Sequence, residues 1–132
     1  MSLLIDTHVW IWSQEEPEKI GRRACSQIRE ADGLFVSTTS TLEIARLIEH
    51  RLLGISRDLD EWITCSLKAL RCEEIGLSRE VALGAYQLPG TFHRDPADRI
   101  LVSTARVHGL TLVTADRRIL RYRGVKTLDI RK

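Results

Sequence analysis

Short apolar runs alternate with amphipathic helical patterns along the whole chain, and this alternation constrains the fold more than any other feature. Runs rich in leucine and β-branched residues at 3–5, 34–36 and 111–114 are short enough to be buried strands. Weaker strand signals follow at 72–75 and 125–130. Strands that alternate with helices across short links indicate an α/β fold whose central sheet, here of five strands, is mostly parallel.

The segments between these runs carry apolar residues at helical spacing. Pro17 and Pro96 suit the first position of a helix, Ser78 suits an N-cap, and Gly54 and Gly109 suit the residue that follows a helix. The expected helices are a short one around Trp10 and Trp12, then 18–31, 39–53, 59–70, a short one after Ser78, and 96–108.

The size and charge of the chain bound its class. Its 132 residues and 15.1 kDa fit one domain over residues 1–132, with a core that needs no disulfide or metal for stability. The balance of 20 basic and 18 acidic residues gives a net charge of +2. This balance excludes a polybasic coat protein, but it is compatible with a nucleic-acid enzyme, which needs only local positive charge.

The sequence also predicts the cellular compartment. Apolar runs such as 9–12 are too short to span a bilayer, and Asp6 interrupts the first apolar run before a signal peptide can form. Cys25, Cys65 and Cys72 have no C-x-x-C spacing, which favours reduced structural thiols over a zinc site or a redox pair. We therefore expect a cytoplasmic protein that does not cross or bind a membrane.

Four carboxylates stand where predicted strands end or where the following helices begin. Asp6 follows the run 3–5, Asp116 follows the run 111–114, and Glu43 and Asp98 lie near helix starts. Because crossovers in a parallel sheet are right-handed, helix N-termini gather at the edge formed by the strand C-termini. We therefore expect all four acids at one edge of the sheet.

Each acid also has a structural interpretation as a helix cap, since the spacings Ser40 to Glu43 and Asp95 to Asp98 are those of a capping box. As a group, however, the acids favour a metal site. Two carboxylates about 4 Å apart repel by about 4 kcal/mol at an effective dielectric constant of 20, and proton uptake or a divalent cation relieves this. A site of carboxylate oxygens suits Mg²⁺ or Mn²⁺ rather than Zn²⁺.

The same segments resemble the PIN-domain family, and in particular its VapC-type toxins. The matching segments are 3–8, 37–45, 93–101 and 112–116, and the most specific part is Asp-Pro-Ala-Asp-Arg at 95–99. The resemblance implies a three-layer α/β/α sandwich with strand order 3-2-1-4-5 and an acidic quartet of Asp6, Glu43, Asp98 and Asp116 around one pocket. The chain departs from the family pattern at Leu47, where a lysine is frequent, and at Ala97, where an aromatic residue is frequent.

The resemblance also implies a function. It implies an endoribonuclease that hydrolyses RNA with Mg²⁺ or Mn²⁺ and is the toxin of a toxin–antitoxin pair. Asp6, Asp98 and Glu43 would bind one or two ions, and Asp116 would hold a second ion or orient the attacking water. The products would carry 5′-phosphate and 3′-hydroxyl ends. The implied protein partners are a cognate antitoxin and a second copy of the chain in a homodimer.

Residues near the quartet have two interpretations each. For Asp95 we favour helix capping, with support of the metal ligands as the alternative. Thr7 and Thr114 either hydrogen-bond the acids or simply end strands. For His8 and His93 we favour a surface or packing role over general acid catalysis. Tyr122 is a candidate for stacking on a base. The candidates for contact with RNA phosphates, or else for an exposed basic face, are Arg94, Arg99, Arg117, Arg118, Arg121 and Arg123.

Two other functions compete with the ribonuclease hypothesis. A phosphotransfer domain with Asp6 as nucleophile also places acids at strand ends, but His8 stands where the phosphatase pattern has its second aspartate. A non-catalytic interaction module would keep the fold without cleaving RNA. A covalent aspartyl-phosphate would identify the first alternative, and a lack of stabilisation by Mg²⁺ the second.

Overall fold

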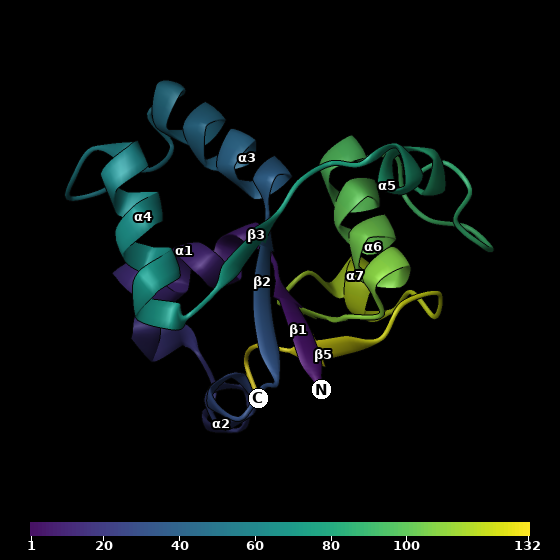
Figure 1. Ribbon diagram of the computed structural model, residues 1–132, viewed down its shortest axis with the longest axis horizontal. Helices are drawn as coiled ribbons and strands as arrows, with labels where there is room; N and C mark the ends of the chain where they lie inside the picture. The colour runs from purple at the N-terminus through teal and green to yellow at the C-terminus, as the bar shows by residue number, and fades with distance from the viewer.

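A single five-stranded parallel sheet forms the centre of the computed structural model, which describes residues 1–132 (Figure 1). The strand order is β3-β2-β1-β4-β5, and every neighbouring pair is parallel. The strands are β1 (Ser2–Ile5), β2 (Gly33–Ser37), β3 (Glu73–Ile75), β4 (Thr111–Thr114) and β5 (Thr127–Asp129). The predicted α/β class, the five strands and their order are confirmed.

Seven α-helices and one 3₁₀ turn connect the strands. They are α1 (Thr7–Glu15), the 3₁₀ turn η1 (Pro17–Lys19), α2 (Arg22–Arg29), α3 (Thr38–Glu49), α4 (Leu59–Leu70), α5 (Arg79–Gly84), α6 (Pro96–His108) and α7 (Arg117–Leu120). None of these helices combines the length and the apolar character needed to cross a lipid bilayer.

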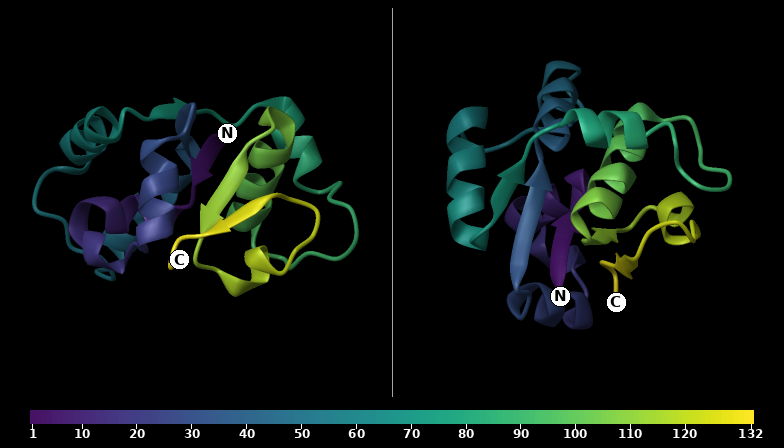
Figure 2. Two further views of the ribbon diagram at one scale, coloured as in Figure 1. Left: turned by 90° about the horizontal axis from the view of Figure 1, so that it is seen from below. Right: turned by 45° about the vertical axis from the view of Figure 1, so that its right-hand side comes forward.

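Helices cover both faces of the sheet, which gives the three layers that the resemblance implies (Figure 2). Because side chains alternate along a strand, Leu3 and Ile5 face one core and Leu4 faces the other. The larger core packs β1 and β2 against α1, α2, α3 and α4, and the smaller one packs β1 and β4 against α6 and α7. Trp10 and Trp62 are buried together in the larger core, with ring centroids 5.4 Å apart.

Two predicted helices are shorter in the structure than the apolar spacing indicated. The expected helix 18–31 is divided into η1 and α2, because the chain at Gly21 lies against the backbone of Arg131 and Lys132, where a Cβ atom would be only 2.4 Å away. The expected helix 39–53 ends at Glu49, since Arg51 turns into the left-handed region with φ 57°. Gly54 therefore does not end a helix.

Polar residues at the carboxyl edge of the sheet cap the helices that start there. Asp6 accepts from the Thr7 amide at the start of α1, and Ser37 accepts from the Thr39 amide at the start of α3. Asp95 and Asp116 cap α6 and α7 in the same way. The parallel register thus gathers four helix N-termini at one edge, which is where the predicted acids lie.

Candidate metal and nuclease site

The four predicted acids line one pocket at the carboxyl edge of the sheet. The pocket has a volume of about 390 Å³. We call it the acidic pocket; its carboxylates are Asp6, Glu43, Asp95, Asp98 and Asp116, and His8, Trp12, Ala115 and Arg118 complete the lining. Residues that lie 110 positions apart in the sequence therefore face the same small volume.

Asp6 is the most deeply placed of these carboxylates, with 8% of its surface exposed. The hydroxyl of Thr114 donates to Oδ2 of Asp6 over 2.6 Å, and the amide of Thr7 donates to Oδ1 over 2.5 Å. Burial raises the pKa of Asp6 above its ordinary value, and the charge of Asp98 adds to this, although the two hydrogen bonds act in the opposite direction. Of the two interpretations of Thr114, the structure confirms the hydrogen bond to an acid.

Glu43 faces Asp6 from the second turn of α3. The hydroxyl of Thr7 donates to its Oε1 over 2.9 Å, so Thr7 contacts both carboxylates. Burial raises the pKa of Glu43, and the charge of Asp6 contributes in the same direction. The N-cap of α3 is Ser37 rather than Ser40, so the interpretation of Glu43 as part of a capping box is wrong.

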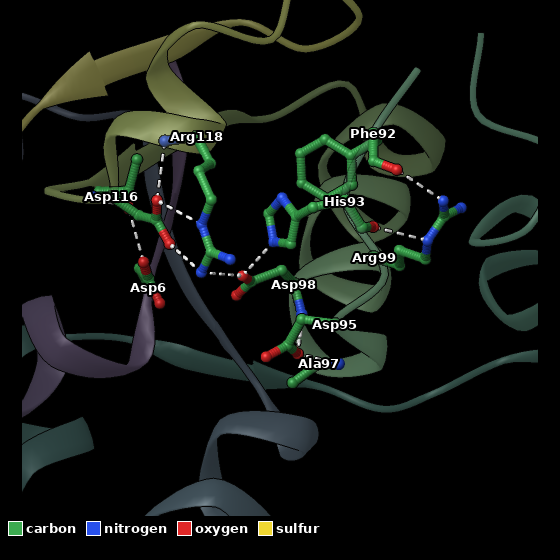
Figure 3. Close-up of polar contacts among 10 residues, drawn as sticks. Asp6, Phe92, His93, Asp95, Ala97, Asp98, Arg99, Asp116 and Arg118 are labelled. Carbon is green, nitrogen blue, oxygen red and sulfur yellow. Dashed lines mark hydrogen bonds and ion pairs between the residues drawn. The ribbon is translucent and has the colours of Figure 1, made fainter. Parts of the chain in front are cut away.

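Asp98 enters the pocket from the first turn of α6 and is paired with His93. The Nε2 atom of His93 lies 2.7 Å from Oδ2 of Asp98, and both side chains are largely buried (Figure 3). Burial raises the pKa of Asp98, and the charges of Asp95 and Asp116 raise it further, while the bond to His93 lowers it. The sequence carried only a weak signal for this pair, since His93 lies in the loop two residues before the cap of α6.

Asp116 is paired with Arg118, which projects from α7 between two carboxylates (Figure 3). Nη2 of Arg118 lies 3.3 Å from Oδ2 of Asp116 and 3.7 Å from Oδ2 of Asp98. The backbone amide of Arg118 also donates to Asp116. Burial acts to raise the pKa of Asp116, but the hydrogen bonds from Arg118 outweigh it and the pKa is lowered.

Asp95 lies at the rim of the acidic pocket and caps α6. Its Oδ1 accepts from the amides of Ala97, over 2.9 Å, and Asp98, over 3.2 Å. The capping interpretation of Asp95 is therefore confirmed, and Pro96 occupies the first helical position as predicted. Its exposed carboxylate still adds negative charge to the pocket.

Arg99 does not have the surface position that its candidacy for RNA contact required. Its guanidinium donates to three backbone carbonyls, those of His93 over 2.9 Å, Ala85 over 3.0 Å and Phe92 over 2.9 Å. It also lies over the ring of Tyr86, 5.1 Å from the centroid. Arg99 thus holds the loop before α6 against α5 and α6, and its assignment as an RNA contact is corrected.

The other arginine candidates remain on the surface. Arg94 is exposed in the loop before α6, and Arg117 is exposed on α7 beside Arg121 and Arg131, outside the acidic pocket. Arg118 is the one that reaches the carboxylates.

The donor set of the acidic pocket fits a hard divalent cation. Every carboxylate supplies oxygen ligands, and burial raises the pKa values of Asp6, Glu43 and Asp98, so a cation beside them would favour their charged forms. In this arrangement, however, no three His, Cys, Asp or Glu side chains are placed to hold one ion together. Arg118 lies between Asp98 and Asp116, and Thr114 holds Asp6, so the quartet as a shared ligand set stays a prediction.

Comparison with known protein families gives a match to the PIN domain model over residues 3–125. The chain belongs to the PIN domain family. The PIN domain described here is also similar to Ribonuclease VapC22 of Mycobacterium tuberculosis, with 35% identity over 129 residues that cover 98% of each chain. The resemblance seen in the sequence is therefore confirmed at the level of the family.

Solved structures support the same fold. The PIN domain superposes on a chain of the DNA-bound VapBC2 crystal structure from Rickettsia felis with a TM-score of 0.68 and 15% identity, covering 97% of this chain and 98% of that one. For DNA-bound VapBC from Salmonella typhimurium the TM-score is 0.66 at 20% identity, with 98% of both chains covered. At this level of identity these structures establish the fold alone.

Proposed function

We propose that the chain is a Mg²⁺- or Mn²⁺-dependent endoribonuclease and the toxin of a toxin–antitoxin pair. The main support is the convergence of Asp6, Glu43, Asp98 and Asp116 on one pocket at the carboxyl edge of the sheet. The full-length similarity to a protein named as a ribonuclease supports hydrolysis of RNA as the reaction. The carboxylate oxygens would hold one or two divalent ions.

A divalent ion bound there lowers the pKa of the attacking water and stabilises the negative charge that develops on the phosphate. In the hydrolysis itself, the water oxygen forms a bond to phosphorus, the bond from phosphorus to the 3′ oxygen breaks, and a proton goes to that oxygen. The products then carry 5′-phosphate and 3′-hydroxyl ends.

The residues around the acids orient them for this work. Thr114 and the Thr7 amide fix both oxygens of Asp6, the Thr7 hydroxyl fixes Glu43, and His93 fixes Asp98. Positioning of this kind favours catalysis because the ligands need not be ordered at the moment of reaction. His93 is a positioning residue in this proposal, and the Arg118 guanidinium lies beside Asp98 and Asp116, the carboxylates that would hold an ion.

The proposal is tested by incubating the purified chain with total RNA, with and without Mg²⁺ or Mn²⁺, beside Asp6→Asn and Asp98→Asn. We expect divalent-dependent cleavage in the wild type and a loss of about 100-fold or more in both variants, with unchanged circular dichroism. Equal cleavage by wild type and variants would indicate a contaminating nuclease and contradict the assignment.

The competing functions give different results in the same samples. A covalent aspartyl-phosphate after incubation with a phosphate donor would favour the phosphotransfer domain. A chain that neither cleaves RNA nor gains thermal stability in millimolar Mg²⁺ would favour the non-catalytic module.

We also propose that the chain binds a cognate antitoxin protein. In this proposal the toxin is active as a homodimer and acts in the cytoplasm. Its support is that the fold neighbours come from VapBC complexes. Expression of the chain alone should slow growth, and a small co-encoded protein should relieve the effect. Normal growth at confirmed expression of active protein would contradict the toxin role.

A further inference from the structure

A second hollow lies beside the acidic pocket and has the opposite charge. It has a volume of about 690 Å³. The loop 89–93 forms one wall, and Arg118 together with residues 121–124 forms the other. We call this hollow the basic groove, because its lining contains Arg118, Arg121 and Arg123 and no acidic side chain.

The walls of the basic groove are fixed by contacts that do not involve the arginines. The Tyr122 hydroxyl donates to the carbonyl of Pro89 over 2.5 Å, and the Tyr122 ring packs on Phe92 with centroids 4.8 Å apart. Gly124 lies so close under the tyrosine that a Cβ atom there would be 2.4 Å from the ring. The groove is therefore preformed, and the Tyr122 ring is a wall of it rather than a free partner for a base.

Positive charge is concentrated in the C-terminal segment, which supplies Arg118 and residues 121–124 to the basic groove. Residues 116–132 contain seven basic and two acidic residues, whereas the other 115 residues contain 13 basic and 16 acidic ones. Arg121 and Arg123 are exposed, and neither takes part in an ion pair. Their guanidinium groups are thus available to an external anion, and arginine is well suited to phosphate.

The basic groove continues into the acidic pocket. His93 and Arg118 line or contact both hollows, since His93 borders the groove and binds Asp98, while Arg118 lines groove and pocket alike. A chain of phosphates that occupies the groove is therefore led towards the carboxylates. An isolated small anion would not need this continuity.

We propose that the basic groove binds the sugar–phosphate backbone of a single-stranded RNA segment next to the bond that is cleaved. Arg121 and Arg123 contact successive phosphates, and the backbone passes Arg118 into the acidic pocket. We choose a single strand over a duplex because its flexible backbone can follow the hollow between the loop 89–93 and residues 121–124. This inference rests on the proposed ribonuclease function and adds the route of the substrate.

The test is binding of a fluorescent, unstructured 12-nucleotide RNA to the Asp98→Asn protein in Mg²⁺, followed by fluorescence anisotropy. In that background, the double variant Arg121→Ala with Arg123→Ala should raise Kd about tenfold at about 100 mM salt. It should also reduce the slope of log K against log salt by about 1.4, because two phosphate contacts on a single strand are lost. The matched control is Arg29→Ala with Lys68→Ala, two exposed cations in the last turns of α2 and α4. The control should leave Kd within about twofold.

The proposal is overturned by an unchanged Kd in the groove variant, by an equal loss in the control variant, or by a duplex of the same sequence that binds as tightly as the single strand. A polyglutamate peptide that competes with the RNA and loses binding equally in the groove variant would also overturn it, in favour of an acidic protein segment. Divalent-dependent cleavage by the wild type, measured in parallel, shows whether a failure belongs to the groove or to the ribonuclease function.

Discussion

The acidic pocket and the basic groove share a wall, yet they hold their charges in different ways. The pocket carboxylates other than Asp95 are buried or half-buried and bound by Thr114, Thr7, His93 or Arg118, and burial raises three of their pKa values. The groove arginines Arg121 and Arg123 are exposed and unpaired. Placing like charges in the pocket therefore lowers folding stability, whereas the exposed charges of the groove have almost no effect on it. Substitutions should separate the two regions accordingly.

The largest difference should appear in steady-state kinetics on a fluorogenic RNA. Asp98→Asn should lower kcat by about 100-fold or more with little change in KM, because it removes a group that acts on the reacting phosphate. Arg121→Ala with Arg123→Ala should raise KM about tenfold and leave kcat within about threefold. A groove variant that loses kcat as severely as Asp98→Asn would mean that the two regions are one catalytic unit.

Arg99 anchors the loop that borders both regions, so its loss should lower the stability of the fold. Arg99→Gln removes charged hydrogen bonds to the carbonyls of His93, Ala85 and Phe92 and should lower the free energy of unfolding by about 2 kcal/mol in urea denaturation. Arg94→Gln, in the same loop and exposed, is the control and should change it by less than about 0.5 kcal/mol. Equal stability of the two variants would refute the anchoring role of Arg99.

Arg118 belongs to both regions and should compete with a metal ion. Without its guanidinium beside Asp98 and Asp116, the pocket is more negative. Arg118→Ala should therefore lower the Mn²⁺ concentration for half-maximal thermal stabilisation by about two- to fivefold, a modest effect because the side chain is 59% exposed. Arg117→Ala is the control on the same helix. A higher Mn²⁺ requirement in Arg118→Ala would mean that Arg118 assists the ion.

The smallest expected effect is a pH-dependent shift in Tm without divalent ions. Because the folded state raises the pKa of Asp6, folding takes up a proton between the unfolded and folded pKa values, and stability falls as pH rises through this window. Asp6→Asn removes this penalty. The difference in Tm between Asp6→Asn and wild type should thus be more favourable at about pH 7.5 than at about pH 4, measured by scanning fluorimetry in EDTA. A difference that is more favourable at the acid end would contradict the sign.

The sheet and the position of the acids could be predicted because they depend on local patterns and on a general rule of parallel topology. Asp6 and Asp116 follow strongly apolar strands, and Asp98 follows a cap and a proline. The strand order, which makes the acids neighbours, came from the family resemblance, since alternation alone allows several orders.

Other features could not be predicted because they depend on contacts between distant parts of the chain. The break at Gly21 coincides with the close approach of the backbone of residues 131–132, and the glycine is the only local sign of it within 18–31. Arg99 looked like a surface arginine because its carbonyl partners lie in a loop whose course is set by Tyr122 and Phe92. The insertion of Arg118 between two acids likewise depends on how closely α7 approaches α6.

Asp6 and Asp116 each cap a helix with the same carboxylate that faces the acidic pocket, and Asp95 does so at its rim. Asparagine and serine cap helices about as well as aspartate, but they bring no negative charge. A single base change from aspartate to asparagine would thus remove a negative charge from the acidic pocket while keeping the helix cap. The fold therefore needs only a capping side chain at these positions, and the negative charge that aspartate adds there serves the acidic pocket rather than the helix.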